Sequence, residues 1–355
     1  MGATYLEIDK SDITDVRFTS DDSSLVATPG TVVLQIDRMA LTSNNVSYAL
    51  SGDFLDYWGF FPAADGWGRL PAMGFSTVIS SAVAGIEEGS RWFGFVPVAS
   101  HHTVQAQVRG DGFVDCAPHR EKHAPAYKQF DPIDPSFTVE DECRHLLLRG
   151  LFVTSHLCED FLADNAMFGA QQVLVTSASS KTSLALAHEI KAHASARTVG
   201  LTSPANVDFV VSTGLYDSVV TYADIPALEV VPSVVVDMAG SSSILRTVHE
   251  RFGDNLGHSC RVGATHWTDN GSMAGMPGPE PQFFFAPAQL VKRGKEWGRE
   301  VLNQRMSTAL AAFAKDSVRW MTVQQSTGDD AVRGVYSSLT GGSVDPSIGH
   351  IVSLS

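Results

Sequence analysis

The chain has 355 residues, of which 44% are hydrophobic and 18% charged, a composition that fits a globular protein of about two domains. Its formal net charge of −14 argues against nucleic acid as a partner, because affinity for a phosphate backbone comes mainly from Lys and Arg. The sequence has no apolar run of membrane-spanning length, no secretory signal at the amino terminus, and no CxxC pair among its four cysteines. We therefore expect a soluble cytoplasmic protein with reduced thiols and no membrane partner.

The first region, to about residue 135, has the pattern of a β-rich domain. Short runs of β-branched and aromatic residues alternate with Gly and Pro turns, which is typical of a small barrel or sandwich. Strands are predicted at residues 32–36, 76–80, 91–96 and 103–108. The polar stretch 118–135 is predicted to be a loop or a linker.

Helical and strand patterns alternate in the second region, from about residue 138 to 290. Helices are predicted at residues 146–151 and 157–165. Apolar strands begin near residues 173, 198, 219, 233 and 259, with helices between them. Such alternation predicts a parallel sheet with helices on both faces.

The remaining residues carry two helical patterns, at 306–316 and 329–339, and a last strand at 350–354. We expect this strand to return to the first domain. The predicted organisation is one domain made of residues 1–137 and 291–355, and a second domain made of residues 138–290.

The most informative stretch is residues 173–182, where an apolar strand passes through small residues into an amphipathic helix. A strand, a tight turn and a helix N-terminus direct backbone N–H groups and the positive end of the helix dipole at one point, which suits a phosphate group. A second apolar strand, residues 198–202, follows about 20 residues later, as it does in a nucleotide-binding half.

This turn lacks the glycines that let a backbone approach a pyrophosphate, since Ser177, Ser180, Lys181 and Ser183 stand where glycine is expected. A cation and hydroxyls in the first helical turn replace part of what bare amides provide. The same residues also fit an ordinary strand-to-helix turn with a Ser or Thr cap and a solvated Lys. The segment by itself leaves both interpretations open.

Several further segments resemble the medium-chain dehydrogenase/reductase superfamily, in particular its quinone and enoyl reductases. Residues 177–182 and 200–203 resemble, more narrowly, a branch catalogued mainly as a family of unknown function. The other similar segments are the first active-site segment (40–53), the Pro-Gly segment after it (70–76), a strand entry (88–94) and the wall of the nicotinamide site (283–287).

The resemblance covers almost the whole chain and implies an α/β fold in two parts. A β-rich, GroES-like barrel domain would carry the substrate and the catalytic residues. A Rossmann-type, doubly wound parallel-sheet domain would bind the dinucleotide. The resemblance also implies a homodimer, in which a strand of the nucleotide domain pairs across a twofold axis.

The sequence departs from the zinc-dependent members of this superfamily. Ser43 stands near the position of a Cys ligand, Met73 and Gly74 stand near that of a His-Glu pair, and the closely spaced cysteines of a structural zinc lobe are missing. His101 and His102 are adjacent, but neighbouring strand residues point to opposite faces, so that one ion is not expected to meet both. We therefore predict no metal.

The predicted cofactor is NADP(H). An acidic residue at the end of the second strand would favour NAD by accepting from the adenosine ribose, but residues 201–206 contain no carboxylate and tolerate a ribose phosphate. Lys181 or Arg197 would add positive charge, and Ser203-Pro204 also fits a plain turn and helix start. The predicted cofactor-binding residues are Ser177, Ser179, Ser180, Lys181, Thr182, Thr202, Ser203, Asn206, Gly263, Phe284 and Phe285.

A reductase without zinc needs a side chain that polarises a carbonyl or protonates the adjacent carbon. Tyr48 is the first candidate, because it lies in the similar active-site segment and a phenol can donate to an enolate oxygen. Asn44 and Asn45 are candidates for orienting substrate or cofactor, while Tyr127 and His156 are weaker ones. Each also has a structural interpretation, since a Tyr near an apolar core packs and consecutive Asn residues cap helices.

Aromatic side chains are dense in residues 56–62 and 65–68, which follow the active-site segment. Beside a cofactor cleft they would favour an aromatic or extended acyl substrate, and they would equally well cap the barrel or bury a dimer surface. Residues 268–279 are predicted to be a mobile loop, either a lid beside the nicotinamide or an exposed surface insertion.

The sequence thus predicts an NADPH-dependent, zinc-independent oxidoreductase that reduces an activated carbonyl or a conjugated C=C bond in a small molecule. The alternative is a nucleotide-binding or non-redox protein on the same fold, with cofactor turnover altered or lost, because function is set by the site and not by the fold.

Overall fold

The computed structural model describes residues 2–22, 24–193, 196–238, 240–262, 275–342 and 344–354. The chain divides into two compact units, a first unit of Met1–Leu147 with Thr322–Ser355 and a second unit of Leu148–Met321. These boundaries differ from the expected ones at 137 and 290. The observed boundary at residues 147 and 148 lies inside a long helix, Val139–Asp164. The two helices that follow residue 285 belong to the second unit.

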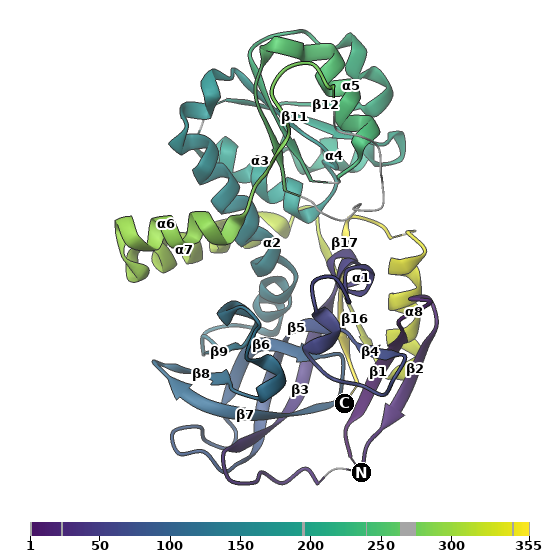
Figure 1. The fold of residues 1–355 in the computed structure, drawn as a ribbon, viewed down its shortest axis with the longest axis vertical. Helices are drawn as coiled ribbons and strands as arrows, with labels where there is room; N and C mark the ends of the chain where they lie inside the picture. Colours follow the sequence, from purple (N-terminus) through teal and green to yellow (C-terminus); the bar gives the residue numbers. More distant parts are fainter. Residues whose placement is uncertain are drawn as a thin grey trace. The chain divides into compact units, whose positions relative to one another are not determined.

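Six antiparallel strands of the first unit close into a barrel. Their order is β3-β5-β6-β9-β8-β7, and β7 pairs again with β3, so that the ring has no free edge. The strands predicted at 32–36, 76–80, 91–96 and 103–108 all lie in this ring. The strands are β3 (Thr31–Leu41), β5 (Pro71–Ser81), β6 (Arg91–Pro97), β7 (His101–Arg109), β8 (Gly112–Asp115) and β9 (Gln129–Pro132), as Figure 1 shows.

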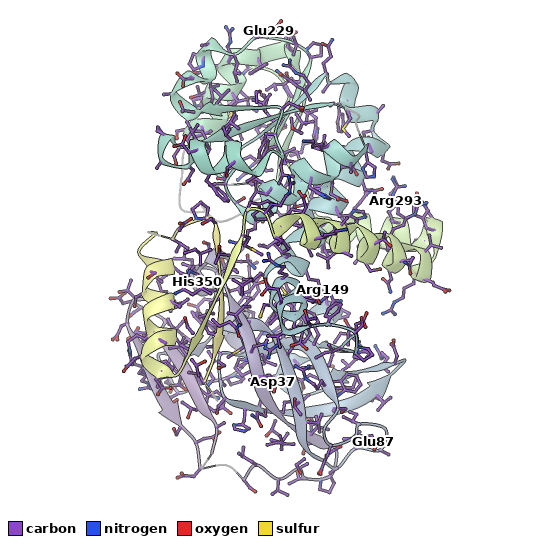
Figure 2. The ribbon with its side chains drawn as sticks, turned by 180° about the vertical axis from the view of Figure 1, so that it is seen from behind. Asp37, Glu87, Arg149, Glu229, Arg293 and His350 are labelled. Atoms are coloured by element: carbon purple, nitrogen blue, oxygen red, sulfur yellow. The ribbon has the colours of Figure 1, made fainter. Side chains whose placement is uncertain are left out.

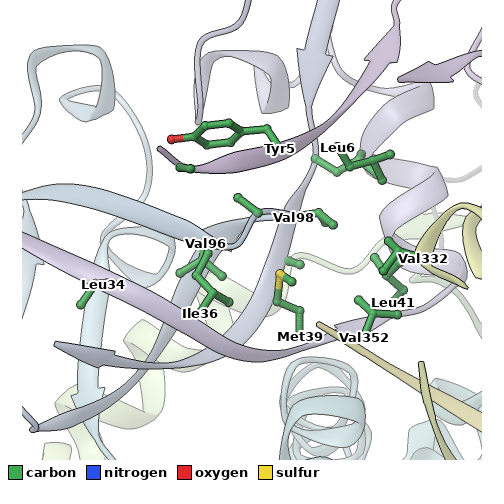
Figure 3. Close-up of a cluster of buried hydrophobic side chains, with 14 of the residues drawn as sticks. Tyr5, Leu6, Leu34, Ile36, Met39, Leu41, Val96, Val98, Val332 and Val352 are labelled. Carbon is green, nitrogen blue, oxygen red and sulfur yellow. The ribbon is translucent and has the colours of Figure 1, made fainter. Parts of the chain in front are cut away.

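The carboxy-terminal segment returns to this unit, as expected. β17 (Ile348–Ser353) pairs antiparallel with β3, and β16 (Thr322–Thr327) pairs parallel with β17. The helix between them, α8 (Asp329–Thr340), supplies Val332 to the core, and β17 supplies Val352. Figure 3 shows these two side chains beside Leu41, and they belong to one core cluster with residues of β1, β3 and β6.

A small second sheet, the short helix α1 and three 3-10 segments complete the part of the first unit that the structure describes. The sheet has the order β2-β1-β4 and is antiparallel. Residues 118–135 are not a linker, because they contain two 3-10 turns and the barrel strand β9. The remaining elements are β1 (Thr4–Asp9), β2 (Val16–Ser20), β4 (Trp67–Arg69), α1 (Ser43–Leu50), η1 (Tyr57–Gly59), η2 (Pro118–Arg120) and η3 (Pro125–Tyr127).

The second unit is built on a parallel sheet of six strands in the order β12-β11-β10-β13-β14-β15. The strand order therefore reverses between β10 and β13, which is the doubly wound arrangement of dinucleotide-binding folds. The predicted strands near 173, 198, 219, 233 and 259 are its first five members. The strands are β10 (Gln172–Val175), β11 (Arg197–Thr202), β12 (Ser218–Thr221), β13 (Ser233–Asp237), β14 (Leu256–Arg261) and β15 (Gln282–Phe283).

Residues 139–164 form one helix, α2 (Val139–Asp164), and not the two that the sequence predicts at 146–151 and 157–165. The polar residues between the two predicted helices do not break it. Ser155 Oγ donates to Leu151 O four residues earlier, at 3.2 Å, and to Thr182 O at 2.7 Å. The hydroxyl is therefore satisfied inside a continuous helix.

Helices cover the parallel sheet, and α6 and α7 pack against each other (Figure 1). Arg293 of α6, labelled in Figure 2, pairs with Asp160 of α2 at 2.7 Å and with Asp164 at 3.0 Å. No described helix is both long and apolar enough to cross a bilayer. The helices are α3 (Lys181–His193), α4 (Val207–Thr213), α5 (Ser242–Phe252), α6 (Ala286–Trp297) and α7 (Arg299–Ser317), with 3-10 segments η4 (Ala166–Gly169), η5 (Pro204–Asn206), η6 (Tyr222–Ala227) and η7 (Gly253–Asn255).

Gly200 of β11 is required by the close packing under the turn that follows β10. A Cβ atom at this position would lie 2.9 Å from the Cβ of Ala178 and 3.0 Å from Cγ of Tyr216. Ala178 is held there because its N–H donates to Leu201 O and its carbonyl accepts from the Tyr216 hydroxyl, both at 3.1 Å.

We predict that Gly200→Val lowers the free energy of unfolding by about 1–3 kcal/mol, because overpacking forces these neighbours apart. Urea unfolding of the variant and the wild type measures the difference. Ala205→Val, at an exposed position after the same strand, is the control and should change stability by less than about 0.5 kcal/mol. Equal stability of the two variants would contradict the packing argument.

Candidate active site

The carboxyl ends of β10 and β13 lie side by side where the strand order reverses, and doubly wound sheets bind their ligands at this point. Thr176 follows β10, and its Oγ1 donates to Asp237 Oδ1 at 2.8 Å. The same carboxylate oxygen accepts from Gly240 N at 3.1 Å, and Thr176 Oγ1 accepts from Met238 N at 2.9 Å. This network fixes the two loops to each other. Sequence analysis missed Asp237, although an acidic residue at the end of the buried run 233–236 is a detectable signal.

Residues 176–182, here called the phosphate turn, begin with a strained backbone. Ser177 has φ of 49°, in the left-handed region where glycine is favoured. Its N–H donates to the Tyr222 hydroxyl at 3.1 Å, which ties the turn to the residue after β12. The amides of Ser177 and Ala178 are therefore used inside the protein.

Two serines that stand in place of glycine, Ser180 and Ser183, stabilise the start of α3. Ser180 Oγ accepts from Ser183 N at 3.1 Å and so caps α3. Ser183 Oγ donates to Thr176 O at 2.9 Å and is buried. Both hydroxyls thus hold α3 against the end of β10, whereas Ser179, Lys181 and Thr182 are partly exposed.

The end of β11 lies next to this turn and carries no carboxylate between residues 202 and 206. Thr202 is buried, while Ser203 and Asn206 are partly exposed. Asn206 Nδ2 donates to Ser179 Oγ at 3.1 Å, so that the two loops are joined. The structure therefore brings together most of the predicted cofactor residues.

Arg197 does not belong to this group. It begins β11, and its guanidinium donates to Gln172 at the start of β10. Five residues of extended chain, about 16 Å, separate it from Thr202 at the carboxyl end. Arg197 therefore lies at the amino ends of the strands, away from the phosphate turn at their carboxyl ends.

The predicted nicotinamide wall is divided between buried and exposed residues. Phe284 is buried, with its ring centroid 5.5 Å from that of Phe161, and its N–H donates to Arg261 O. Phe285 is 58% exposed. Gly263 and most of the predicted lid at 268–279 lie outside the described residues.

His156, a weaker catalytic candidate, holds α2 to α3. Its Nδ1 donates to Glu189 Oε2 at 2.6 Å, and His188 Nδ1 donates to the other oxygen at 3.1 Å. Burial by itself would raise the pKa of Glu189, but the hydrogen bonds and charges of the two histidines lower it to about 2. These hydrogen bonds stabilise the helix that begins at the phosphate turn.

In the first unit, the three candidates on α1 have different environments. The side chain of Asn45 completes a capping box, since its Oδ1 accepts from Thr42 N at 2.8 Å, and its Nδ2 donates to Pro71 O at 2.9 Å. Asn44 is partly exposed and lies one helical turn before Tyr48. Burial raises the pKa of Tyr48. The Asn45 amide is thus engaged within the fold, whereas Asn44 and Tyr48 stay candidates.

The two adjacent histidines contact different neighbours. His101 Nδ1 lies 3.0 Å from Ser100 Oγ, and the His102 ring lies edge-on to Phe61 with 5.1 Å between ring centroids. Among the residues that the structure describes, no group of three or more His, Cys, Asp or Glu is arranged to hold a metal ion. Independence from zinc stays a prediction.

The barrel and the doubly wound sheet together have the fold of the medium-chain dehydrogenases/reductases. CurA from Vibrio vulnificus, solved in complex with NADPH, matches with a TM-score of 0.64 and 12% identity, covering 99% of each chain. CurK enoyl reductase matches with a TM-score of 0.60 and 14% identity, covering 100% of both chains. A mutant enoyl thioester reductase from Candida tropicalis matches with a TM-score of 0.57 and 11% identity, also covering 100% of both chains.

A family model described as "Protein of unknown function (DUF2855)" matches residues 39–345, which is most of the chain. The protein belongs to this family, as the short strings at 177–182 and 200–203 suggested. No curated protein matches the sequence.

Proposed function

We propose that this protein is an NADPH-dependent, zinc-independent reductase of an activated carbonyl or a conjugated C=C bond. The observation that carries the proposal is the phosphate turn, which opens a helix at the strand-order reversal of a doubly wound sheet. A helix N-terminus at this place favours an anion through its N–H groups and its dipole. The resemblance of residues 40–53 to quinone and enoyl reductases supports the same class of reaction.

The residues around the turn fit a dinucleotide with a ribose phosphate. Ser179, Lys181 and Thr182 would hold the pyrophosphate, with the Lys181 ammonium supplying the charge that a glycine-rich turn lacks. Ser203 and Asn206 would donate to the ribose phosphate, since no carboxylate at the end of β11 repels it. NADPH is therefore favoured over NADH.

NADPH would supply the hydride, and this chain's own residues would supply the proton and the polarisation of the substrate. Addition of hydride to a conjugated C=C bond moves the π electron pair toward the carbonyl oxygen and gives an enolate. The Tyr48 hydroxyl then gives its proton to the adjacent carbon, and the tyrosinate regains a proton from water. Because burial raises the pKa of Tyr48, its phenol remains a proton donor at neutral and mildly alkaline pH.

Lys181→Ala tests the nucleotide site. We expect the Kd for NADPH to rise by about tenfold or more, because a charge-assisted hydrogen bond to phosphate is lost. Isothermal titration calorimetry measures this change. Lys191→Ala, near the other end of α3, where Lys191 Nζ donates to Gly214 O, is the matched control. Unchanged NADPH affinity in Lys181→Ala would refute this account of the turn.

Tyr48→Phe tests the proton donor. We expect kcat to fall on the order of 100-fold, the usual contribution of a general acid, while the Kd for NADPH stays the same. Between pH 7 and pH 9 the wild-type kcat should show no decline from loss of this proton, since the pKa of Tyr48 is raised. Tyr336→Phe, which removes another buried hydroxyl of the first unit, should leave kcat unaltered. Full activity of Tyr48→Phe eliminates this role.

We propose further that the protein is a homodimer formed through β15, the last strand of the parallel sheet. Phe283 on this strand and Phe285 just after it are 54% and 58% exposed, and an exposed apolar strand at a sheet edge invites pairing with a second copy. Light scattering should give the mass of two chains for the wild type and of one chain for Phe283→Asp. A monomeric wild type at micromolar concentration would rule out this interface.

A further inference from the structure

Two buried cysteines of the second unit face each other where a helix contacts the parallel sheet. Cys158 lies on α2 and Cys260 on β14, and their Sγ atoms are 4.0 Å apart. The two residues are 102 positions apart in the sequence, and both side chains are fully buried. Both are free thiols. The fold therefore brings two nucleophilic sulfur atoms into direct contact.

A pair of aromatic side chains holds the helix and the strand in this register. His258 precedes Cys260 by two residues on β14, so both side chains lie on the same face of the sheet. Phe161 follows Cys158 by three residues on α2 and lies on the same side of the helix. The ring centroids of Phe161 and His258 are 5.6 Å apart, and the Phe168 ring stacks on His258 at 4.2 Å. The two sulfur atoms are thus held opposite each other by regular elements and by this aromatic contact.

The surroundings of Cys260 favour its thiolate, which is the reactive form of a cysteine. The hydrogen bond from the Cys158 thiol and the nearby His258 ring lower the pKa of Cys260, against the effect of burial, which by itself would raise it. The same hydrogen bond and burial raise the pKa of Cys158. Cys260 is therefore the sulfur that we expect to react first, and Cys158 is in place to react with the product.

We propose that Cys158 and Cys260 are a redox-active dithiol that a hydroperoxide converts into a reversible intramolecular disulfide. The Cys260 thiolate attacks one oxygen of hydrogen peroxide, the O–O bond breaks, and Cys260 becomes a sulfenic acid while hydroxide leaves. The Cys158 thiolate then attacks the Cys260 sulfur, an S–S bond forms, and the S–O bond breaks to release a second hydroxide. The protons of the two thiols convert both hydroxides to water. Two thiols and one peroxide thus give one disulfide and two waters, and the modification does not depend on the proposed reductase function.

The disulfide joins α2 to the sheet beside the candidate nucleotide site. To reach the S–S bond length of about 2 Å, the two sulfur atoms approach by about 2 Å, through rotation of both side chains and a small shift of α2. Hydrogen peroxide is close to water in size, and local opening of the native state admits it to the buried thiols. Cys260 pairs in register with Val236, the residue before Asp237. Because the closed loop is long, the bond stabilises the folded second unit.

The test is treatment of the full-length protein with hydrogen peroxide, followed by alkylation of the remaining thiols in urea with iodoacetamide and mass mapping of the peptides. We expect the peptides that contain Cys158 and Cys260 to be recovered joined to each other, and dithiothreitol to return both to the alkylated form. Cys158→Ala and Cys260→Ala should each abolish the joined peptide. Cys143→Ala removes another fully buried thiol and is the matched control, in which the joined peptide should be unchanged.

Thermal melting gives a second readout, which two merely packed cysteines would not produce. Oxidation should raise the Tm of the wild type by about 5 °C or more and leave the Tm of Cys158→Ala and Cys260→Ala unchanged. An unchanged Tm of the oxidised wild type overturns the stabilising effect.

Recovery of Cys158 and Cys260 as free thiols after peroxide treatment, or a disulfide that joins either of them to another cysteine, overturns the redox site. The two residues are then only apolar packing in the core. If either variant unfolds, the wild-type peptide map decides the question alone, because it identifies both members of the bond.

Discussion

The hydrogen bond from Thr176 to Asp237 is the constraint on which the candidate nucleotide site depends. It joins the ends of β10 and β13 at the reversal of strand order, the one place where the loops of a doubly wound sheet diverge. The amides of Gly240 and Met238 extend the network, so that two loops are fixed by one buried carboxylate and one hydroxyl. A site for an anion needs such fixed donors, because loops that must first be ordered lose affinity.

The serines of the phosphate turn stabilise a strand-to-helix turn that lacks glycine. Ser180 and Ser183 turn their hydroxyls inward and hold α3 close to β10, and Gly200 beneath them leaves the space for this packing. The left-handed conformation of Ser177 costs about 1–2 kcal/mol, which the hydrogen bond from its amide to Tyr222 helps to offset. The turn thus keeps its shape, while Ser179, Lys181 and Thr182 remain partly exposed.

The sequence predicted those parts of the fold that rest on local patterns. Alternating strands and helices from residue 173 onward predicted the parallel sheet, because each buried strand is a short apolar run between turns. The short strand β9 was not predicted, since its pairing with β6 is long-range in the sequence. The short strand β8 was not predicted either, although it forms a local hairpin with β7. The turn and Tyr48 were found through motif and resemblance, whereas the contact of Thr176 with Asp237 was not, because no local spacing brings residues from two separate strands together. Asn45 looked like a site residue because a capping amide and a substrate-binding amide have the same sequence signal.

Titration of the wild-type protein with NADPH, NADP, NADH and NAD tests the central claim most directly, which is that the serine- and lysine-containing turn binds a nicotinamide dinucleotide. The account predicts micromolar binding of NADPH and much weaker binding of NADH, because residues 202–206 contain no carboxylate to select the free ribose. Binding of none of the four would contradict the account and would make a non-redox function on this fold the leading explanation.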